Sequence, residues 1–157
     1  MKDHSEKISD REALLRLQKI CSHTEKSEAE IRQKIAQWGL QDKANTLITN
    51  LRRNDFINPD RYIRAFIKDK IQLNKWGKTK VRYYLRGQQF EDEIINGMLS
   101  EYDDETYENM VFSELRKKKK SVRENNPMKL KSKLYSFGNQ RGYESHIISK
   151  FLHEKDS

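Results

Sequence analysis

The sequence predicts an all-α protein built from three tandem three-helix repeats in an elongated array. Its 157 residues include only two prolines and six glycines, and no stretch of any length alternates between apolar and polar residues as a half-buried strand does. Similar segments recur about every 50 residues, a spacing typical of tandem structural repeats.

The composition indicates the same architecture. Hydrophobic residues make up 34% of the chain and charged residues 36%, and the mean hydropathy is -1.05. Because a globular domain ordinarily draws on roughly 45–50% apolar residues, the core must be thin, which suits small helical units that each bury one stripe. A single cysteine, and no apolar run long enough for a signal peptide or a spanning helix, lead us to expect a cytoplasmic protein.

We expect three repeats at residues 9–55, 56–102 and 103–154, after a disordered N-terminus at residues 1–8. Residues 90–99 and 143–152 show the repetition most clearly, because an aromatic residue, a glutamate, an Ile-Ile pair and a final leucine follow in the same order in both. The expected helices of the second repeat are 58–76, 78–88 and 91–102, and those of the third are 104–123, 127–137 and 144–154.

Capping residues predict the helix starts of the first repeat. Ser9 with Glu12, and Ser27 with Glu30, have the spacing of a capping box, in which each side chain binds the other residue's backbone amide. Asp42 is expected to cap a third helix. Apolar residues follow each start at helical spacing: Leu14, Leu17 and Cys21, then Ile31, Ile35 and Trp38, then Ala44, Leu47, Ile48 and Leu51.

Caps of another kind open helices in the later repeats. Asn58-Pro59-Asp60 combines an Asn N-cap, a proline at the first helical position and an acid in the positive first turn, and Asn126-Pro127 repeats the first two features. Ile63, Phe66, Ile67 and Ile71 then form an apolar stripe. Gly77 separates this helix from the next, so the two form a hairpin.

The positive charge is concentrated in one segment. The chain has 32 Lys and Arg against 24 Asp and Glu, a net charge of +8, and residues 116–133 hold nine of the bases and one acid, so the other 23 bases and 23 acids cancel. A local basic patch indicates an anionic partner, either a phosphate backbone or an acidic protein groove; the alternative is a solvated face that only keeps the protein soluble. With a smaller basic face on helix 78–88, the candidate binding residues are Lys117, Lys118, Lys119, Lys120, Arg123, Lys129, Lys131, Lys133, Lys78, Lys80, Arg82 and Arg86.

No cluster of residues predicts catalysis, a metal or a cofactor. Cys21 has no second cysteine with which to share a zinc ion and is typical of a small buried residue. Gly77-Lys78-Thr79 resembles the end of a phosphate-binding loop, but Gln72 replaces the glycine that opens such a loop, and a helix precedes it. Trp76 and Tyr83 suit stacking on bases or on a partner, although packing between the three-helix units is the favoured interpretation.

The order of motifs in residues 55–90 resembles the central repeat of the RecX family. Phe56-Ile57-Asn58 is followed by Asp60-Arg61-Tyr62, by Ala65-Phe66-Ile67 and by Gly77, which precedes a basic helix with Val81, Arg82, Leu85 and Arg86. Ser27-Glu28-Ala29-Glu30 with Gly39 and a weaker third repeat extend the resemblance over roughly residues 27–152. Three turn positions depart from the pattern: Asp55 and Gln89 stand where glycine is usual, and Lys78 stands where proline often follows the glycine.

This resemblance implies a function as well as a fold. RecX proteins are non-enzymatic modulators of the RecA recombinase, so the resemblance implies an elongated, curved array of helical repeats in the groove of the RecA filament on single-stranded DNA. There it restrains filament growth, ATP hydrolysis and strand exchange, in recombinational DNA repair and the SOS response. We expect a monomer with no membrane partner, whose basic faces contact the filament or its DNA.

Two other functions fit the residues. Short three-helix units also resemble helix-turn-helix modules, which would make this a free-standing DNA-binding regulator with a helix that reads base edges. A helical scaffold that binds an acidic protein would show no affinity for DNA or for a filament.

Overall fold

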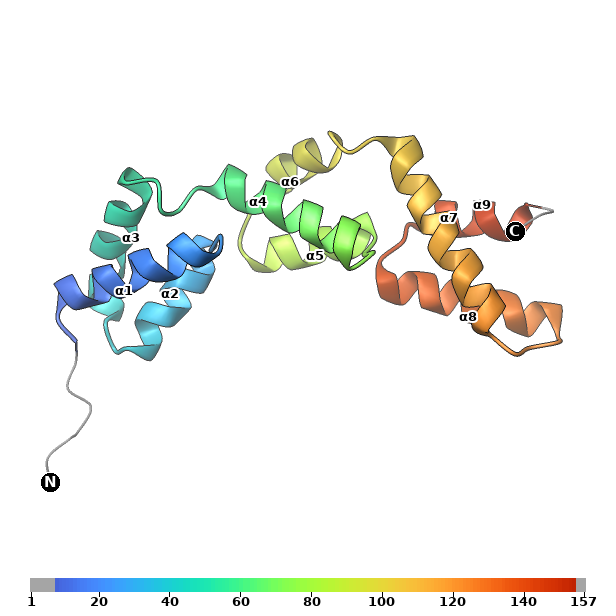
Figure 1. Cartoon of the computed structure of the whole chain (residues 1–157), viewed down its shortest axis with the longest axis horizontal. Coiled ribbons are helices and arrows are strands. Elements are labelled where there is room, and N and C mark those ends of the chain that lie inside the picture. The colour runs from blue at the N-terminus through green and yellow to red at the C-terminus, as the bar shows by residue number, and fades with distance from the viewer. Residues whose placement is uncertain (1–7, 155–157) are drawn as a thin grey trace, which may run out of the picture. The chain divides into compact units, whose positions relative to one another are not determined.

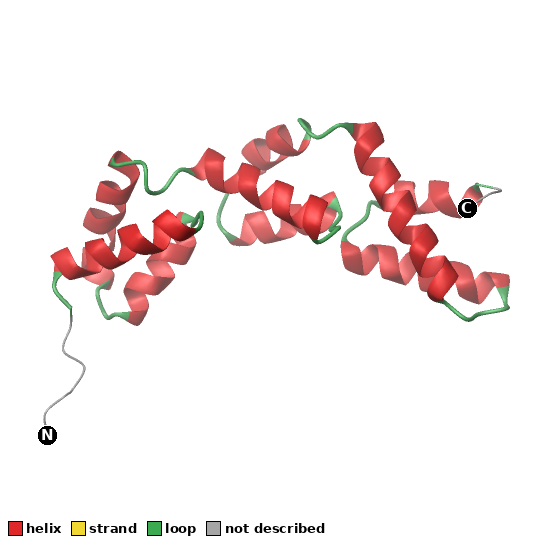
Figure 2. Cartoon of the chain, in the orientation of Figure 1, coloured by secondary structure: helices red, strands yellow, loops and turns green. Residues whose placement is uncertain are grey.

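The computed structural model describes residues 8–154 and, within them, contains nine α-helices and no strand (Figure 1). Short loops join the helices (Figure 2), and the prediction of an all-α protein of three-helix repeats is confirmed. Residues 1–7 of the predicted disordered segment lie outside the described residues, whereas Ile8 packs against the core of the first repeat. None of the described helices is both long enough and apolar enough to cross a membrane.

The first three helices are α1 (Asp10–His23), α2 (Glu28–Gln37) and α3 (Ala44–Arg53). The side chains of Ser9 and Ser27 accept hydrogen bonds from the amides of Glu12 and Glu30, each at 3.1 Å, so both predicted N-caps are present. The predicted cap at Asp42 is wrong. A 3₁₀ turn at Gln41–Lys43 contains Asp42, and α3 begins at Ala44 without a side-chain cap because that turn leads directly into the helix.

The next three helices are α4 (Pro59–Lys68), α5 (Lys78–Gly87) and α6 (Asp92–Leu99). Asn58 caps α4 as predicted, by accepting the amide of Arg61 at 3.1 Å. A π-helical turn at Asp69–Leu73 continues α4, and the buried Ile71 lies in it. By its contacts the chain divides into two compact units, one up to Ala65 and the other from Phe66 on.

The last three helices are α7 (Asp104–Ser121), α8 (Pro127–Arg141) and α9 (Ser145–His153). Helix α8 was expected to end near Phe137, but it runs to Arg141. Gly138 is accommodated within the helix because α9 packs against it there: a Cβ atom on Gly138 would lie 2.6 Å from Cδ1 of Ile148. The glycine therefore serves helix packing and not helix termination.

The second helix of every triplet ends in the same way. Each of these helices ends at a residue with a left-handed backbone. In α2 and α5 it is the first residue past the C-cap, Gly39 (φ 73°) and Gln89 (φ 69°), and in α8 it is the C-cap itself, Gly142 (φ 87°). The backbone amide of the following residue donates a hydrogen bond to a carbonyl in the last turn of the helix. The pairs are Leu40 to Ile35, Phe90 to Leu85 and Tyr143 to Gly138. This hydrogen bond closes a helix C-terminus whose carbonyls would otherwise lack partners. Gln89 is thus a non-glycine residue at a position that favours glycine.

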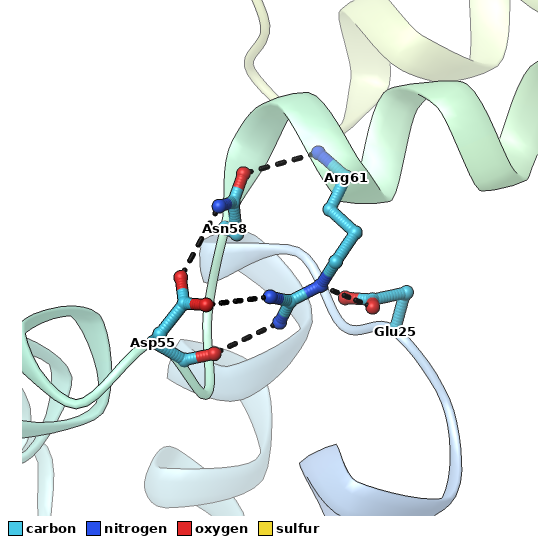
Figure 3. A network of polar contacts seen from close by, with 4 residues as sticks. All are labelled: Glu25, Asp55, Asn58 and Arg61. Atoms are coloured by element: carbon cyan, nitrogen blue, oxygen red, sulfur yellow. Dashed lines mark hydrogen bonds and ion pairs between the residues drawn. The ribbon is translucent and has the colours of Figure 1, made fainter.

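Four residues of the first unit form a polar network around Arg61 (Figure 3). Nε of Arg61 donates to Glu25, between α1 and α2, at 2.5 Å, and its other nitrogens donate to the carboxylate and the carbonyl of Asp55 at 3.0 and 2.9 Å. Nδ2 of Asn58 also donates to the Asp55 carboxylate, at 3.2 Å. Asp55 has φ 62°, so the network holds a non-glycine residue in a left-handed turn.

The N-terminus of α5 is capped by residues distant in sequence. Gly77, its N-cap, has no side chain to accept a hydrogen bond. Instead the amide of Gly77 donates to the carbonyl of Arg141 at 2.7 Å, and that of Thr79 donates to the carbonyl of Gly142 at 3.1 Å. The amide of Lys78 donates to the Tyr107 hydroxyl at 2.9 Å. The backbone carbonyls at the end of α8 thereby satisfy the amides at the start of α5.

Candidate anion-binding surfaces

A groove between α7 and α8 brings together three of the predicted basic residues. Lys118 lies in the last turn of α7, Arg123 lies in the loop that follows, and Lys133 lies on α8. Cations in the last turn of a helix also interact favourably with the partial negative charge at its C-terminus. We call this the basic groove; its lining is completed by Val122, Ser132, Ser136, Phe137 and Gln140.

Two contacts position the lysines of the basic groove. The ammonium group of Lys118 lies 5.4 Å from the centre of the Phe137 ring, a cation–π distance. Nζ of Lys133 binds the carboxylate of Glu124 at 3.1 Å, and the hydrogen bond from Lys133 lowers the pKa of Glu124. Arg123 is exposed and has no ion-pair partner among the described residues. The groove therefore offers a guanidinium, an ammonium, and the hydroxyls of Ser132 and Ser136 to an anion such as phosphate or carboxylate.

The other predicted residues of the basic segment lie outside the groove lining. Lys117 pairs with Glu114 at 3.5 Å, and Lys119 is half-buried. Lys120, Lys129 and Lys131 are exposed on α7 and α8. The segment thus consists of one groove with exposed, half-buried and ion-paired cations around it.

The second predicted basic face, on α5, is more occupied by internal contacts. Lys78 has a side chain only 12% exposed, with its ammonium 3.6 Å from Asp104 and 4.6 Å from the centre of the Tyr107 ring. Nε of Arg82 donates to Asn96 at 2.8 Å, and Arg86 forms a close ion pair with Asp92. These three side chains line an open hollow together with Asp104 and Glu144. Carboxylates pair with Lys78 and Arg86, and Arg82 is held by an amide, so this face is the weaker candidate for binding an anion.

Lys80, the fourth predicted residue of α5, belongs to a different surface. Its ammonium lies 4.3 Å from the centre of the Trp76 ring, and Trp76 is in contact with Tyr84 at a ring-centre distance of 5.0 Å. Tyr83 was expected to pack between the repeats, but it is 72% exposed. The sequence contained a signal for this surface, because Lys80, Tyr83 and Tyr84 share one face of α5 at helical spacing.

The described residues hold no group of three His, Cys, Asp or Glu side chains that could bind a metal ion. Cys21 is buried, and burial raises the pKa of its thiol above the ordinary value. The thiol is therefore poorly reactive, in keeping with a packing role.

The fold and the groove define an all-α protein of tandem three-helix units with one concentrated basic surface. The family model described as "RecX, third three-helix domain" matches residues 105–152. The regulatory protein RecX of Clostridium acetobutylicum is 35% identical over 136 residues, which cover 83% of this chain and 63% of that protein. Its counterpart in Clostridium beijerinckii is 30% identical over 137 residues, covering 85% and 63%.

Two solved structures share the fold. A crystal structure of regulatory protein RecX superposes with a TM-score of 0.82 at 16% identity, over 92% of this chain and 73% of that one. RecX from Lactobacillus salivarius superposes with a TM-score of 0.76 at 17% identity, over 93% and 96%. In sequence over most of its length, and in fold, the chain is similar to the RecX regulatory proteins. It spans less than two thirds of the length of the two clostridial relatives.

Proposed function

We propose that this protein is a non-enzymatic regulator of the RecA recombinase. It binds the RecA filament on single-stranded DNA and restrains filament growth, ATP hydrolysis and strand exchange. Similarity to the RecX regulatory proteins carries the proposal, and the basic groove between α7 and α8 supports it with a surface suited to an anionic partner.

The basic groove and the exposed lysines around it are the proposed contact surface on this chain. Surface cations that meet an extended anionic partner act additively through released counterions. Arg123, Lys120, Lys129 and Lys131 suit such a role, because they are exposed and have no ion-pair partner among the described residues. Lys78 suits it least, since its ammonium group is held inside the second unit by Asp104 and Tyr107.

The ATPase rate of RecA on single-stranded DNA tests the proposal. With RecA from the same source, this protein is titrated in from well below one copy per RecA. A fall in the rate at substoichiometric amounts supports regulation of the filament. An unchanged rate at equimolar protein contradicts it and favours the DNA-binding or scaffold alternative.

Substitutions in the basic segment then test the contact surface. Replacing Lys117, Lys118, Lys119 and Lys120 by glutamine removes four positive charges from the end of α7, and we expect weaker inhibition of the ATPase without unfolding. A matched control replaces Lys19, Lys34, Lys43 and Lys68 by glutamine, which removes the same charge outside the segment. Equal inhibition by both variants and the parent protein would show that the segment does not take part in inhibition. Circular dichroism verifies from the helix content that each variant folds.

A further inference from the structure

Four aromatic rings form a continuous series in the second unit. Phe66 lies 6.2 Å from Trp76, Trp76 lies 5.0 Å from Tyr84, and Tyr84 lies 5.6 Å from Tyr83, measured between ring centres. Trp76 precedes α5, and the two tyrosines lie on that helix. We call these four residues the aromatic face.

The outer end of the aromatic face is open to solvent. Tyr83 is 72% exposed and Tyr84 is 47% exposed, while Phe66 and Trp76 are half-buried. The inner rings therefore anchor the series in the fold, and the outer rings present their surfaces. Exposed aromatic rings held rigidly beside one another are typical of a binding surface.

Positive charge accompanies these rings. The ammonium of Lys80 lies 4.3 Å from the centre of the Trp76 ring, and that of Lys70 lies 5.0 Å from the same ring and 5.6 Å from Phe66. Asp69 is the one acid paired with these lysines among the described residues, at 4.0 Å from Lys70. The surface therefore combines aromatic rings with an excess of positive charge.

Gly87 leaves the helix surface beside these tyrosines bare. It follows Tyr83 and Tyr84 by one helical turn, so it continues their face of α5. A Cβ atom at Gly87 would meet nothing within 4 Å, so the fold does not require glycine there, and alanine would favour the helix. A bare helix surface beside the two tyrosines allows a ligand to approach the backbone closely.

We propose that the aromatic face is a stacking surface for the unpaired bases of single-stranded nucleic acid, with Lys70 and Lys80 contacting its phosphates. Aromatic rings accept any base because every base has a flat π-face, and neighbouring cations follow the backbone. The charge complementarity favours a polyanion, and a duplex cannot use this surface because its bases are stacked on one another. The inference goes beyond RecA regulation, because the surface binds the strand without a recombinase and lies outside the basic groove.

The test uses the full chain and no RecA. Binding of fluorescently labelled oligothymidine is followed by anisotropy and compared with an abasic strand of the same length, which keeps the phosphates and lacks the bases. We expect the protein to bind oligothymidine more tightly than the abasic strand. Tyr83→Ala is expected to weaken binding of oligothymidine roughly 5- to 150-fold, the effect of losing one base–aromatic stack, and to have little effect on binding of the abasic strand.

Two further variants make the test specific. Tyr83→Phe keeps the ring and is expected to bind as the parent does, whereas Leu15→Ala removes an exposed apolar side chain from α1 and is expected to change nothing. Equal affinity of the parent for both strands, or unchanged binding by Tyr83→Ala, would overturn the proposal in favour of phosphate contact alone. Absence of binding to either strand would also overturn it. Inhibition of RecA is measured separately, so failure of one proposal is distinguishable from failure of the other.

Discussion

The backbones of Gly77 and Gly142 meet so closely that a Cβ atom on Gly77 would lie 2.1 Å from the carbonyl oxygen of Gly142. A Cβ atom on Gly142 would in turn lie 2.2 Å from Cβ of Lys80. Both glycines are buried, and hydrogen bonds from Gly77 and Thr79 to the end of α8 cross the same contact. This backbone contact joins the start of α5 to the turn between α8 and α9.

Gly77→Ala is therefore expected to destabilise the second unit. The new methyl group clashes with backbone atoms, which cannot move aside as a flexible side chain can. The free energy of unfolding should therefore fall by roughly 3 kcal/mol. Urea unfolding followed by circular dichroism measures the loss. The control is Gly87→Ala, where a Cβ atom meets nothing within 4 Å and stability should be unchanged or slightly higher. Equal stability of both variants would contradict the close contact.

Gln89→Gly is expected to stabilise the protein. Gln89 has φ 69°, a backbone conformation that is strained for residues with a Cβ atom and unstrained for glycine. The substitution should therefore raise the free energy of unfolding by roughly 1 kcal/mol. For a chain of this size that corresponds to a rise in Tm of about 3 °C. Gln88→Gly is the matched control, because Gln88 has φ -86° and glycine there should lower the Tm.

The buried tyrosines predict a loss of stability in alkali. Tyr107 donates to Glu144 at 2.5 Å, and burial and the Glu144 charge raise the pKa of Tyr107. Burial and the Glu30 contact raise the pKa of Tyr62, and burial raises the pKa of Tyr143 to about 12. In the unfolded chain tyrosine ionises near about pH 10. Above that pH the unfolded chain releases protons that the folded chain retains, so stability is complete below about pH 10 and falls as the pH rises toward 12.

The urea midpoint measured over this alkaline range checks the prediction. Tyr107→Phe should be less stable at neutral pH by roughly 1–2 kcal/mol, because Glu144 and the amide of Lys78 lose a hydrogen-bond partner. The same variant should lose stability less steeply in alkali. A slope identical to that of the parent would show that Tyr107 does not contribute to the pH dependence.

Arg61→Lys is expected to weaken the turn between α3 and α4. A single ammonium cannot reach both Glu25 and the two oxygens of Asp55 that the guanidinium binds. Since the network is partly exposed, the loss of stability should be at most about 1 kcal/mol. The hydrogen bond from Asn58, the Arg61 charge and a hydrogen bond from Arg61 lower the pKa of Asp55. Lysine keeps the charge but loses the guanidinium hydrogen bond, so the pKa of Asp55 should rise slightly in the variant when followed by NMR.

Arg53→Lys is the control for that experiment. Arg53 is an exposed residue of α3 with no ion-pair partner among the described residues, so its replacement should change neither stability nor the pKa of Asp55. An Asp55 pKa that is the same in both variants and in the parent would contradict the network.

Local sequence signals predicted most of the helices. Ser9, Ser27 and Asn58 cap the helices that they were expected to cap, because an N-cap depends on residues within one turn of it. The same local reasoning was wrong at Asp42 and ended α8 too early. At Gly138 the deciding contact is with Ile148 of another helix, which no local pattern contains.

The proposed binding surfaces were located less completely. The sequence identified the basic segment, but only Lys118, Arg123 and Lys133 among its predicted residues line the groove. Lys78 belonged to the same prediction, yet its side chain is held against Tyr107 and Asp104. Net charge shows that cations are present, while their availability depends on the acids and rings that folding brings beside them.

The sequence by itself determined the all-α class, the period of the repeats, most helix starts and the location of the excess charge, because capping, helical spacing and composition are local properties. Tertiary structure alone decided how Gly77 meets Gly142, why α5 needs no side-chain cap and that Tyr83 faces solvent. Those features depend on contacts between residues distant in the chain. Their energies come from close packing and from hydrogen bonds between helix ends, and neither exists until the helices have assembled.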